Sequence, residues 1–271
     1  MKKTTQVTKL ICILYILSAV LLLMSLIHPD YNAPNEPENH YGDESALSPI
    51  EARAREIAER TIGNGENDGI DNSWALWLIN AKNPLPYGYL PELSELTVEL
   101  EIDARVAEYA LLMIMAARFD GVTLTPISAY RSAMRQESNF INFYNNKISD
   151  GILPEEAFEY TLYRIAVPYT SEHNAGIAID FNLVEEQFDT TKEFHWLQEN
   201  AHKFGFIMRY PKDSQNITGI IYEPWHYRFV GLYHAERIRN WGLTLEEYYG
   251  YCAADYSAVD NFRNKLLPIN H

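Results

Sequence analysis

The longest apolar run in the sequence extends from Leu10 to Ile27 and contains no charged residue. At about 1.5 Å per residue in a helix it reaches roughly 27 Å, close to the roughly 30 Å hydrocarbon core of a bilayer. Lys2, Lys3 and Lys9 precede it, which places the N-terminus in the cytoplasm and the rest of the chain outside. The pattern predicts a single-pass anchor in the cell membrane with an extracellular body. A cleaved signal peptide is the alternative, although no small-x-small cleavage site follows the run.

Downstream of residue 72, apolar residues recur at helical spacing in some segments and alternate as in strands in others. One helix is predicted between Asp103, which can cap it, and Gly121, which can end it. A strand is predicted at 122–128, and Pro126 confines it to an edge or a bulge. Strands that come in clusters, separated by helices of uneven length, predict a single α+β domain with a small, mainly antiparallel sheet and helices packed against one side. The other predicted elements are helices at 132–147, from 154 onward and at 191–204, and strands at 177–181 and 206–210.

The segment between the anchor and this domain, residues 29–71, is rich in Asn, Pro, Glu, Gly and Asp. Such a composition predicts an extracellular tether rather than a packed core. Within it, Ser48-Pro49-Ile50-Glu51 has the pattern of a capping box and predicts one short helix. The predicted organisation is a cytoplasmic tip and membrane anchor at 1–28, the tether at 29–71, a globular domain at 72–251 and a C-terminal tail at 252–271.

Charge and cysteine content exclude some classes of protein. The formal net charge of −15 argues against a nucleic-acid partner, because phosphate binding requires a basic surface. Of the two cysteines, Cys12 lies inside the apolar run and Cys252 near the end of the chain, so they cannot pair across that separation and the exported domain is expected to have no disulfide. Its stability is then expected to come from its core and from a bound metal.

Metal-binding chemistry is concentrated in two short segments. His173 and Asp180 flank a glycine-containing turn, and imidazole together with carboxylate suits zinc. A zinc ion that performs chemistry keeps three protein ligands, so a third ligand must come from elsewhere. His226 is the best candidate. Glu223, three residues before it, could then act as the general base.

Residues three apart on an unbroken strand point to opposite faces, so a bulge or turn at Pro224 is required to aim both side chains at one point. Arg131 lies in the turn between the strand at 122–128 and the helix that follows. A surface role and a role in a site are equally consistent with that position. Surface or core positions, and no contact with the metal, are expected for three other histidines: His195, His202 and His234.

Together these motifs resemble those of the VanY-type zinc D-alanyl-D-alanine carboxypeptidases of bacteria, which are related to VanX dipeptidases and to L,D-carboxypeptidases. The resemblance extends from about Leu78 to Gly231. One small departure is alanine at position 129, where glycine is common in the family. Four ordered motifs carry the resemblance: Asn83-Pro84-Leu85-Pro86; Ser128-Ala129-Tyr130-Arg131-Ser132 with Gln136; Ser171-Glu172-His173 with Gly176, Ala178 and Asp180; and Glu223-Pro224-Trp225-His226 with Arg228.

The resemblance implies zinc as the cofactor, with His173, Asp180 and His226 as its ligands. It implies that Glu223 is the catalytic base, and that Arg131 is catalytic by binding or polarising the scissile carbonyl. The residues that it implies for substrate binding are Gln136, Ser171, Tyr210 and Trp225.

The expected function is removal of the C-terminal D-alanine from peptidoglycan stem peptides. An L,D-carboxypeptidase, or an endopeptidase that cuts inside the stem peptide, would use the same site, and both alternatives stay open. A non-catalytic peptidoglycan-binding module would be expected to lack Glu223 or Arg131. A serine carboxypeptidase is excluded, because no serine here has lysine three residues later. The membrane anchor favours a resident wall-trimming enzyme over a lytic one.

Overall fold

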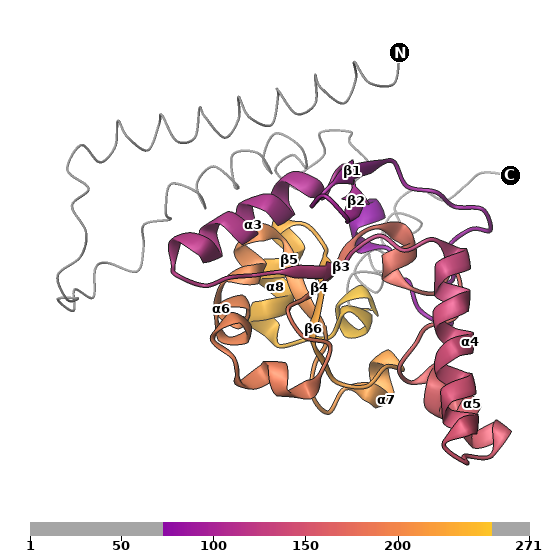
Figure 1. Cartoon of the computed structure of the whole chain (residues 1–271). Coiled ribbons are helices and arrows are strands. Elements are labelled where there is room, and N and C mark those ends of the chain that lie inside the picture. The colour runs from indigo at the N-terminus through magenta and orange to yellow at the C-terminus, as the bar shows by residue number, and fades with distance from the viewer. Residues whose placement is uncertain (1–72, 251–271) are drawn as a thin grey trace, which may run out of the picture. The chain divides into compact units, whose positions relative to one another are not determined.

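The computed structural model describes residues 73–250. The membrane segment predicted at Leu10–Ile27, the short helix predicted from Ser48 and the C-terminal tail lie outside the described residues. Within the described range, no helix combines the length and apolar character needed to cross a membrane. In chain order (Figure 1) the elements are η1 (Ser73–Leu76), β1 (Leu93–Glu95), β2 (Glu101–Asp103), α3 (Ala107–Phe119), β3 (Pro126–Ser128), α4 (Ala133–Ser149), α5 (Pro154–Leu162), η2 (Glu172–Ala175), β4 (Ala178–Phe181), η3 (Glu186–Thr190), α6 (Lys192–Asn200), η4 (Ala201–Phe204), β5 (Phe206–Tyr210), α7 (Gln215–Thr218), β6 (Glu223–Phe229) and α8 (Leu232–Trp241).

Four strands form the central sheet in the order β3-β4-β6-β5, and every neighbouring pair is antiparallel. A separate antiparallel pair, β1 and β2, lies beside it. The strand that contains Pro126 is at the edge, as its missing N–H requires. In the pairing of β4 with β6, Asp180 lies directly opposite His226. The predicted single α+β domain with a small antiparallel sheet is therefore confirmed.

Side-chain alternation gives the sheet two chemically different faces. Ile179, Phe181, Tyr227 and Phe229 are each at most 1% exposed and join the main hydrophobic core, which includes the buried side of α3. The residues between them must point to the opposite face, because successive side chains of a strand alternate. That face therefore receives the polar side chains of β4, β5 and β6, which are Asp180, Arg209, His226 and Arg228.

Helices pack on both faces of the sheet, and in this respect the sequence-based prediction was wrong. Met113 of α3 packs in the main core with β4 and β6. Ile207 of β5 and Val230, just after β6, pack instead with Ala235 and Ile238 of α8 in a second, smaller cluster. The cause lies in β5, which has apolar residues on both faces. Phe206 and Met208 pack in the main core and Ile207 packs in the second cluster, so helices are needed on both sides. The helices α4 and α5 pack against each other, away from α6 (Figure 1).

Two local predictions are corrected by the structure. The strand predicted at 122–128 is reduced to Pro126–Ser128. The residues just before Pro126 bond to both the side chain and the backbone of Asn182. These bonds, to Thr123 and Thr125, replace a regular ladder. Asp103 does not cap α3, which has Val106 at its N-cap, but ends β2 and accepts hydrogen bonds from Arg105.

Candidate metal and catalytic site

His173 is positioned by a tight turn between α5 and β4. The side chain of Ser171 caps this turn by accepting a hydrogen bond from the backbone nitrogen of His173 at 3.3 Å. The turn ends at Gly176, whose φ is +71°, and a Cβ there would lie 2.9 Å from the backbone nitrogen of Asp103. Only glycine fits both the left-handed conformation and this close approach. The turn therefore places His173 against β4 with little freedom.

His173, Asp180 and His226 come together, and their possible ligand atoms lie within 4.8 Å of one another. All three side chains are buried. The two rings are perpendicular, with centroids 4.9 Å apart. The carboxylate of Asp180 lies between them, with one oxygen 3.2 Å from Nε2 of His173 and the other 3.0 Å from Nδ1 of His226. This is the only such group of three that the described part of the chain contains.

Hydrogen bonds on the far side of each ring indicate which nitrogen faces the group. Nδ1 of His173 lies 2.7 Å from the carbonyl oxygen of Ala129, so it must donate and leave Nε2 facing Asp180. In His226 the arrangement is reversed, because Nε2 lies 3.2 Å from a carboxylate oxygen of Glu172 and Nδ1 faces Asp180. Each ring can thus offer one lone pair to a shared cation while its other nitrogen is held from behind.

The electrostatics of the three groups suit a cation. Burial would raise the pKa of Asp180, but the two histidines beside it hold that pKa well below its usual range. Burial lowers the pKa of His173, which favours the neutral ring that can act as a ligand. Burial also acts to lower the pKa of His226, yet the carboxylates of Asp180 and Glu172 raise it to about 9. His226 therefore sits where a positive charge is stabilised.

Glu223 reaches the same point through a bulge in β6. Met208 pairs with Tyr227 and Tyr210 pairs with Glu223, so two steps along β5 match four along β6. The irregularity predicted around Pro224 is present. One carboxylate oxygen of Glu223 lies 3.8 Å from Nδ1 of His226, on the side of the ring that faces Asp180. Burial raises the pKa of this carboxyl to about 8, although nearby positive groups oppose the shift.

Arg131 lies across from these residues, between β3 and α4. Its guanidinium is 4.0 Å from Asp180 and is held by hydrogen bonds of 2.8 Å to Ser128 and 2.8 Å to Gln136. Its backbone nitrogen donates to the carbonyl of His173 at 2.9 Å, which ties this turn to the ligand turn. Of its five N–H donors, two make these side-chain bonds, and the hydrogen bonds among the described residues leave the others available to a ligand.

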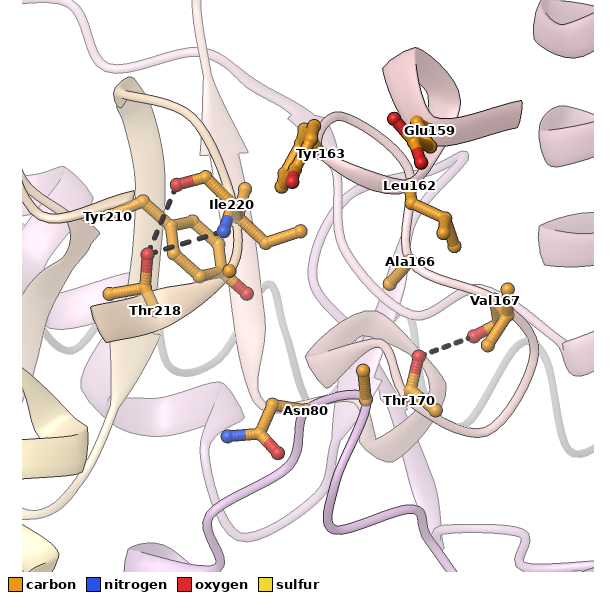
Figure 2. Close-up of a pocket in the computed structure, with 12 residues that line it drawn as sticks. Asn80, Glu159, Leu162, Tyr163, Ala166, Val167, Thr170, Tyr210, Thr218 and Ile220 are labelled. Atoms are coloured by element: carbon orange, nitrogen blue, oxygen red, sulfur yellow. Dashed lines mark hydrogen bonds between the residues drawn. The ribbon is translucent and has the colours of Figure 1, made fainter. Parts of the chain in front are cut away.

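The described residues also enclose a pocket of about 350 Å³, whose lining is drawn in Figure 2. Tyr210 lines it, and the ring of Tyr210 lies 5.0 Å from that of His226. Thr170, next to Ser171, also lines it. The other lining residues are Asn80, Ala81, Glu159, Leu162, Tyr163, Ala166, Val167, Thr218, Gly219 and Ile220.

The four predicted substrate-binding residues differ in their relation to this pocket. Tyr210 forms part of its wall, whereas Gln136 lies behind the wall and donates to the carbonyl of Ala166, a lining residue. Ser171 adjoins the lining and is buried. Trp225 is 6% exposed and packs in the main core. The position of Trp225 therefore gives it a packing role and does not support the predicted contact with substrate.

Sequence reasoning assigned no role to three charged residues behind the site, although two of them, Glu172 and Arg228, belong to the motifs. Glu172, Arg209 and Arg228 form a buried ion cluster that contacts His226. A signal for the arginines was present, since each interrupts a strand whose other residues are mostly apolar or aromatic. The excluded histidines are elsewhere, as expected: His195 on α6, His202 on η4 and His234 on α8.

Comparison with known proteins identifies the family. Residues 99–232 match the family model VanY, described as D-alanyl-D-alanine carboxypeptidase. A D-alanyl-D-alanine carboxypeptidase of Enterococcus faecalis is 36% identical over 215 residues, which cover 79% of this chain and 78% of that protein. The chain belongs to the VanY family.

Solved structures of VanY relatives share the fold. A VanY D,D-pentapeptidase from a VanB-type resistance cassette, in complex with Zn(II), is 39% identical and covers 65% of this chain and 99% of its own, with a TM-score of 0.60. VanYB in complex with D-alanine-D-alanine aligns with a TM-score of 0.61 at 39% identity, covering 65% and 98%. The LD-carboxypeptidase LdcB aligns with a TM-score of 0.58 at 33% identity, covering 68% and 92%.

Proposed function

We propose that this protein is a zinc-dependent carboxypeptidase that removes the C-terminal D-alanine from peptidoglycan stem peptides. The observation that carries the proposal is the gathering of His173, Asp180 and His226 within 4.8 Å, with Glu223 beside them. Membership of the VanY family, and the zinc and D-alanine-D-alanine complexes of its relatives, support the same activity.

The donor set fits zinc. Two imidazoles and one carboxylate are three protein ligands, which leaves one position of a tetrahedron open, as catalytic zinc sites require. Zinc, when bound there, lowers the pKa of a water molecule and polarises a carbonyl group. His173 and His226 would bind through Nε2 and Nδ1 respectively, and Asp180 through its carboxylate.

Glu223 is the general base in this proposal. Its carboxylate is on the metal-facing side of His226 and has no arginine or lysine within 4.0 Å among the described residues, so it can take up a proton from the attacking water. Because it is not one of the three ligands, it can pass that proton to the leaving amine of D-alanine. The mechanism thus needs Glu223 in its charged form at the start of each cycle.

Arg131 supplies positive charge where the scissile carbonyl develops negative charge. Its guanidinium is oriented in advance by Ser128 and Gln136, so little reorganisation is needed when the substrate binds. The adjoining pocket, lined by Tyr210 and Thr170, is of ordinary size for a small ligand and is the proposed place for the end of the stem peptide (Figure 2).

Mass spectrometry of two defined stem peptides tests the proposal with the full-length, zinc-loaded protein. Loss of one D-alanine from a pentapeptide ending in D-alanyl-D-alanine supports a D,D-carboxypeptidase. Loss of D-alanine only from a tetrapeptide, where it follows the diamino acid, supports an L,D-carboxypeptidase, the activity for which LdcB is named. Fragments cut inside the stem indicate an endopeptidase. No cleavage of either peptide contradicts the proposal.

The location of the enzyme is a separate proposal. The apolar run at residues 10–27 would anchor it as a single-pass protein in the cell membrane, with the catalytic domain outside. Support comes from the sequence pattern alone. Protease treatment of intact cells, followed by membrane fractionation, should degrade the catalytic domain of the full chain and find the N-terminal remnant in the membrane. A catalytic domain protected in intact cells would contradict this orientation.

A further inference from the structure

Glu172 is a fully buried carboxylate at the back of the metal site. Its side chain is 0% exposed, and it directly precedes His173 in η2. A buried carboxylate is costly unless it is paired and hydrogen-bonded. Its two oxygens have different partners. Oε1 accepts from Arg209 at 2.6 Å and from Arg228 at 2.7 Å, whereas Oε2 lies 3.2 Å from Nε2 of His226. One oxygen therefore binds the arginines and the other binds the ring.

The two arginines are themselves fixed, so they hold Glu172 in one orientation. Nη2 of Arg228 donates to the backbone carbonyls of Ala75 at 3.0 Å and Trp77 at 2.8 Å. Arg209 binds both carboxylate oxygens of Glu246, at 2.7 and 2.6 Å. Because neither guanidinium can turn without losing these bonds, Oε2 of Glu172 stays aimed at His226.

Both ring nitrogens of His226 face a carboxylate: Nε2 lies 3.2 Å from Glu172 and Nδ1 lies 3.0 Å from Asp180. A carboxylate accepts hydrogen bonds only, so without a metal both nitrogens can carry a proton. To bind a metal through Nδ1 the ring must release the proton there, and the proton that Glu172 accepts then stays on Nε2. A ring with the proton on Nδ1 instead could not offer that nitrogen to a metal.

We infer that Glu172 is a positioning residue of the zinc site: held by Arg209 and Arg228, it fixes His226 in the tautomer whose Nδ1 faces the metal. The inference rests on the zinc site of the proposed function and not on its substrate. It gives the buried ion cluster a role in metal affinity, since outer partners of metal-binding histidines set the orientation and basicity of the ring.

A purely structural role for Glu172, as a neutralising partner of the arginines, is the competing explanation. Glu246 allows the two roles to be separated. It also binds Arg209 with two hydrogen bonds, but no hydrogen bond or ion pair described in the structure joins it to His226. Replacing either glutamate with glutamine removes one negative charge from the same cluster. Only the change at Glu172 alters the group that faces the ring.

Glutamine at position 172 is a sharp test because it has a single acceptor oxygen. Two cationic arginines compete for that oxygen, which leaves the amide NH₂ facing Nε2 of His226. An NH₂ donor favours the opposite tautomer, with the proton on Nδ1. For Glu172→Gln we therefore expect zinc affinity to fall by about 10- to 100-fold, the range found for such outer partners. For Glu246→Gln we expect a change below about threefold.

The experiment measures the zinc dissociation constant of the full-length wild type and of both variants by competition with a chromophoric chelator. Thermal unfolding of the metal-free proteins is followed alongside. A selective loss of affinity in Glu172→Gln supports the inference. Equal affinities in all three proteins, or equal losses in the two variants, overturn it. No substrate is present, so these outcomes are independent of whether the enzyme releases D-alanine.

A measurement on the wild type keeps the inference testable if Glu172→Gln does not fold. Long-range ¹H–¹⁵N NMR of the zinc-loaded protein should show His226 protonated at Nε2 and His173 protonated at Nδ1. The Nε2 proton of His226 should exchange with water far more slowly than that of the exposed His195. A rapidly exchanging Nε2 proton, or protonation of His226 at Nδ1, overturns the inference.

Discussion

Replacing Glu223 with glutamine should abolish turnover while leaving zinc in place. The substitution keeps the size of the side chain and removes its ability to accept a proton. Loss of a general base typically lowers turnover by about 10²- to 10⁴-fold. The three ligands, His173, Asp180 and His226, are unchanged, so we expect the variant to retain close to one zinc per chain.

The same substitution should stabilise the metal-free protein at high pH. Burial raises the pKa of Glu223 from its ordinary 4.5 to about 8, so between these values the folded state holds a proton that the unfolded state has released. The stability of the metal-free wild type therefore falls as the pH rises from 4.5 to 8. The shift of about 3.5 units (8 minus 4.5), at about 1.36 kcal/mol per unit, gives an upper bound of about 5 kcal/mol. Glutamine, which carries no charge, avoids this loss.

Three measurements on one set of proteins check both expectations. Atomic absorption gives zinc content, release of D-alanine from a pentapeptide gives turnover, and urea unfolding of the chelator-treated proteins at pH 5 and pH 9 gives stability. Glu236→Gln, at an exposed position on α8, is the matched control and should behave as wild type throughout. Wild-type turnover in Glu223→Gln would refute the proposed base. An equal pH dependence of stability in variant and wild type would refute the assigned burial cost.

Three further predictions address other parts of the molecule. Arg131→Ala should keep zinc and lose about 10²- to 10³-fold in turnover, as for one lost oxyanion donor. Arg135→Ala, on the exposed side of α4, should keep wild-type turnover. Equal turnover in the two variants would contradict the role of Arg131. Gly176→Ala should lower the free energy of unfolding by about 2 kcal/mol or more, because left-handed strain of about 1–2 kcal/mol adds to the clash with β2. Gly219→Ala, with φ +78° and no atom within 4 Å of its Cβ, should show the strain alone. Urea unfolding of both variants tests this. Burial lowers the pKa of His234 to about 4, so between pH 6.5 and 4 the unfolded state binds a proton that the folded state does not bind. The free energy of unfolding should therefore fall by up to about 3 kcal/mol as the pH drops through this range. An unchanged acid sensitivity in His234→Gln would contradict this.

The metal ligands could be found from the sequence because each stands out against its local pattern. Asp180 is the single charge in the apolar strand Ala178–Phe181, and His173 lies in a turn closed by a glycine. His226 was found as the candidate third ligand with Glu223 three residues before it, and strand alternation required the irregularity at Pro224 that the structure shows. These features are local, so propensity and alternation were sufficient.

The ion cluster behind the ligands could not be found in this way. Glu172 meets Arg209 and Arg228 across separations of 37 and 56 residues, which depend on strand order and register. The packing of Trp225 was missed for a related reason, because its direction depends on how the bulge before it is resolved. The packing of α8 on the second face could not be predicted either. The apolar residues of β5 show that both faces are buried, but they do not show which helix buries each face.

The bonds that hold Arg228 and Arg209 also define how much chain the enzyme needs. Family resemblance is detectable over residues 99–232, yet the carbonyls of Ala75 and Trp77 and the carboxylate of Glu246 lie outside that range. A fragment trimmed to the recognisable motif would keep every metal ligand and leave two buried cations short of partners. The smallest transplantable catalytic unit therefore begins before Ala75 and ends after Glu246, and relatives that diverge in these flanks can differ in the stability of the folded domain while their motifs stay identical.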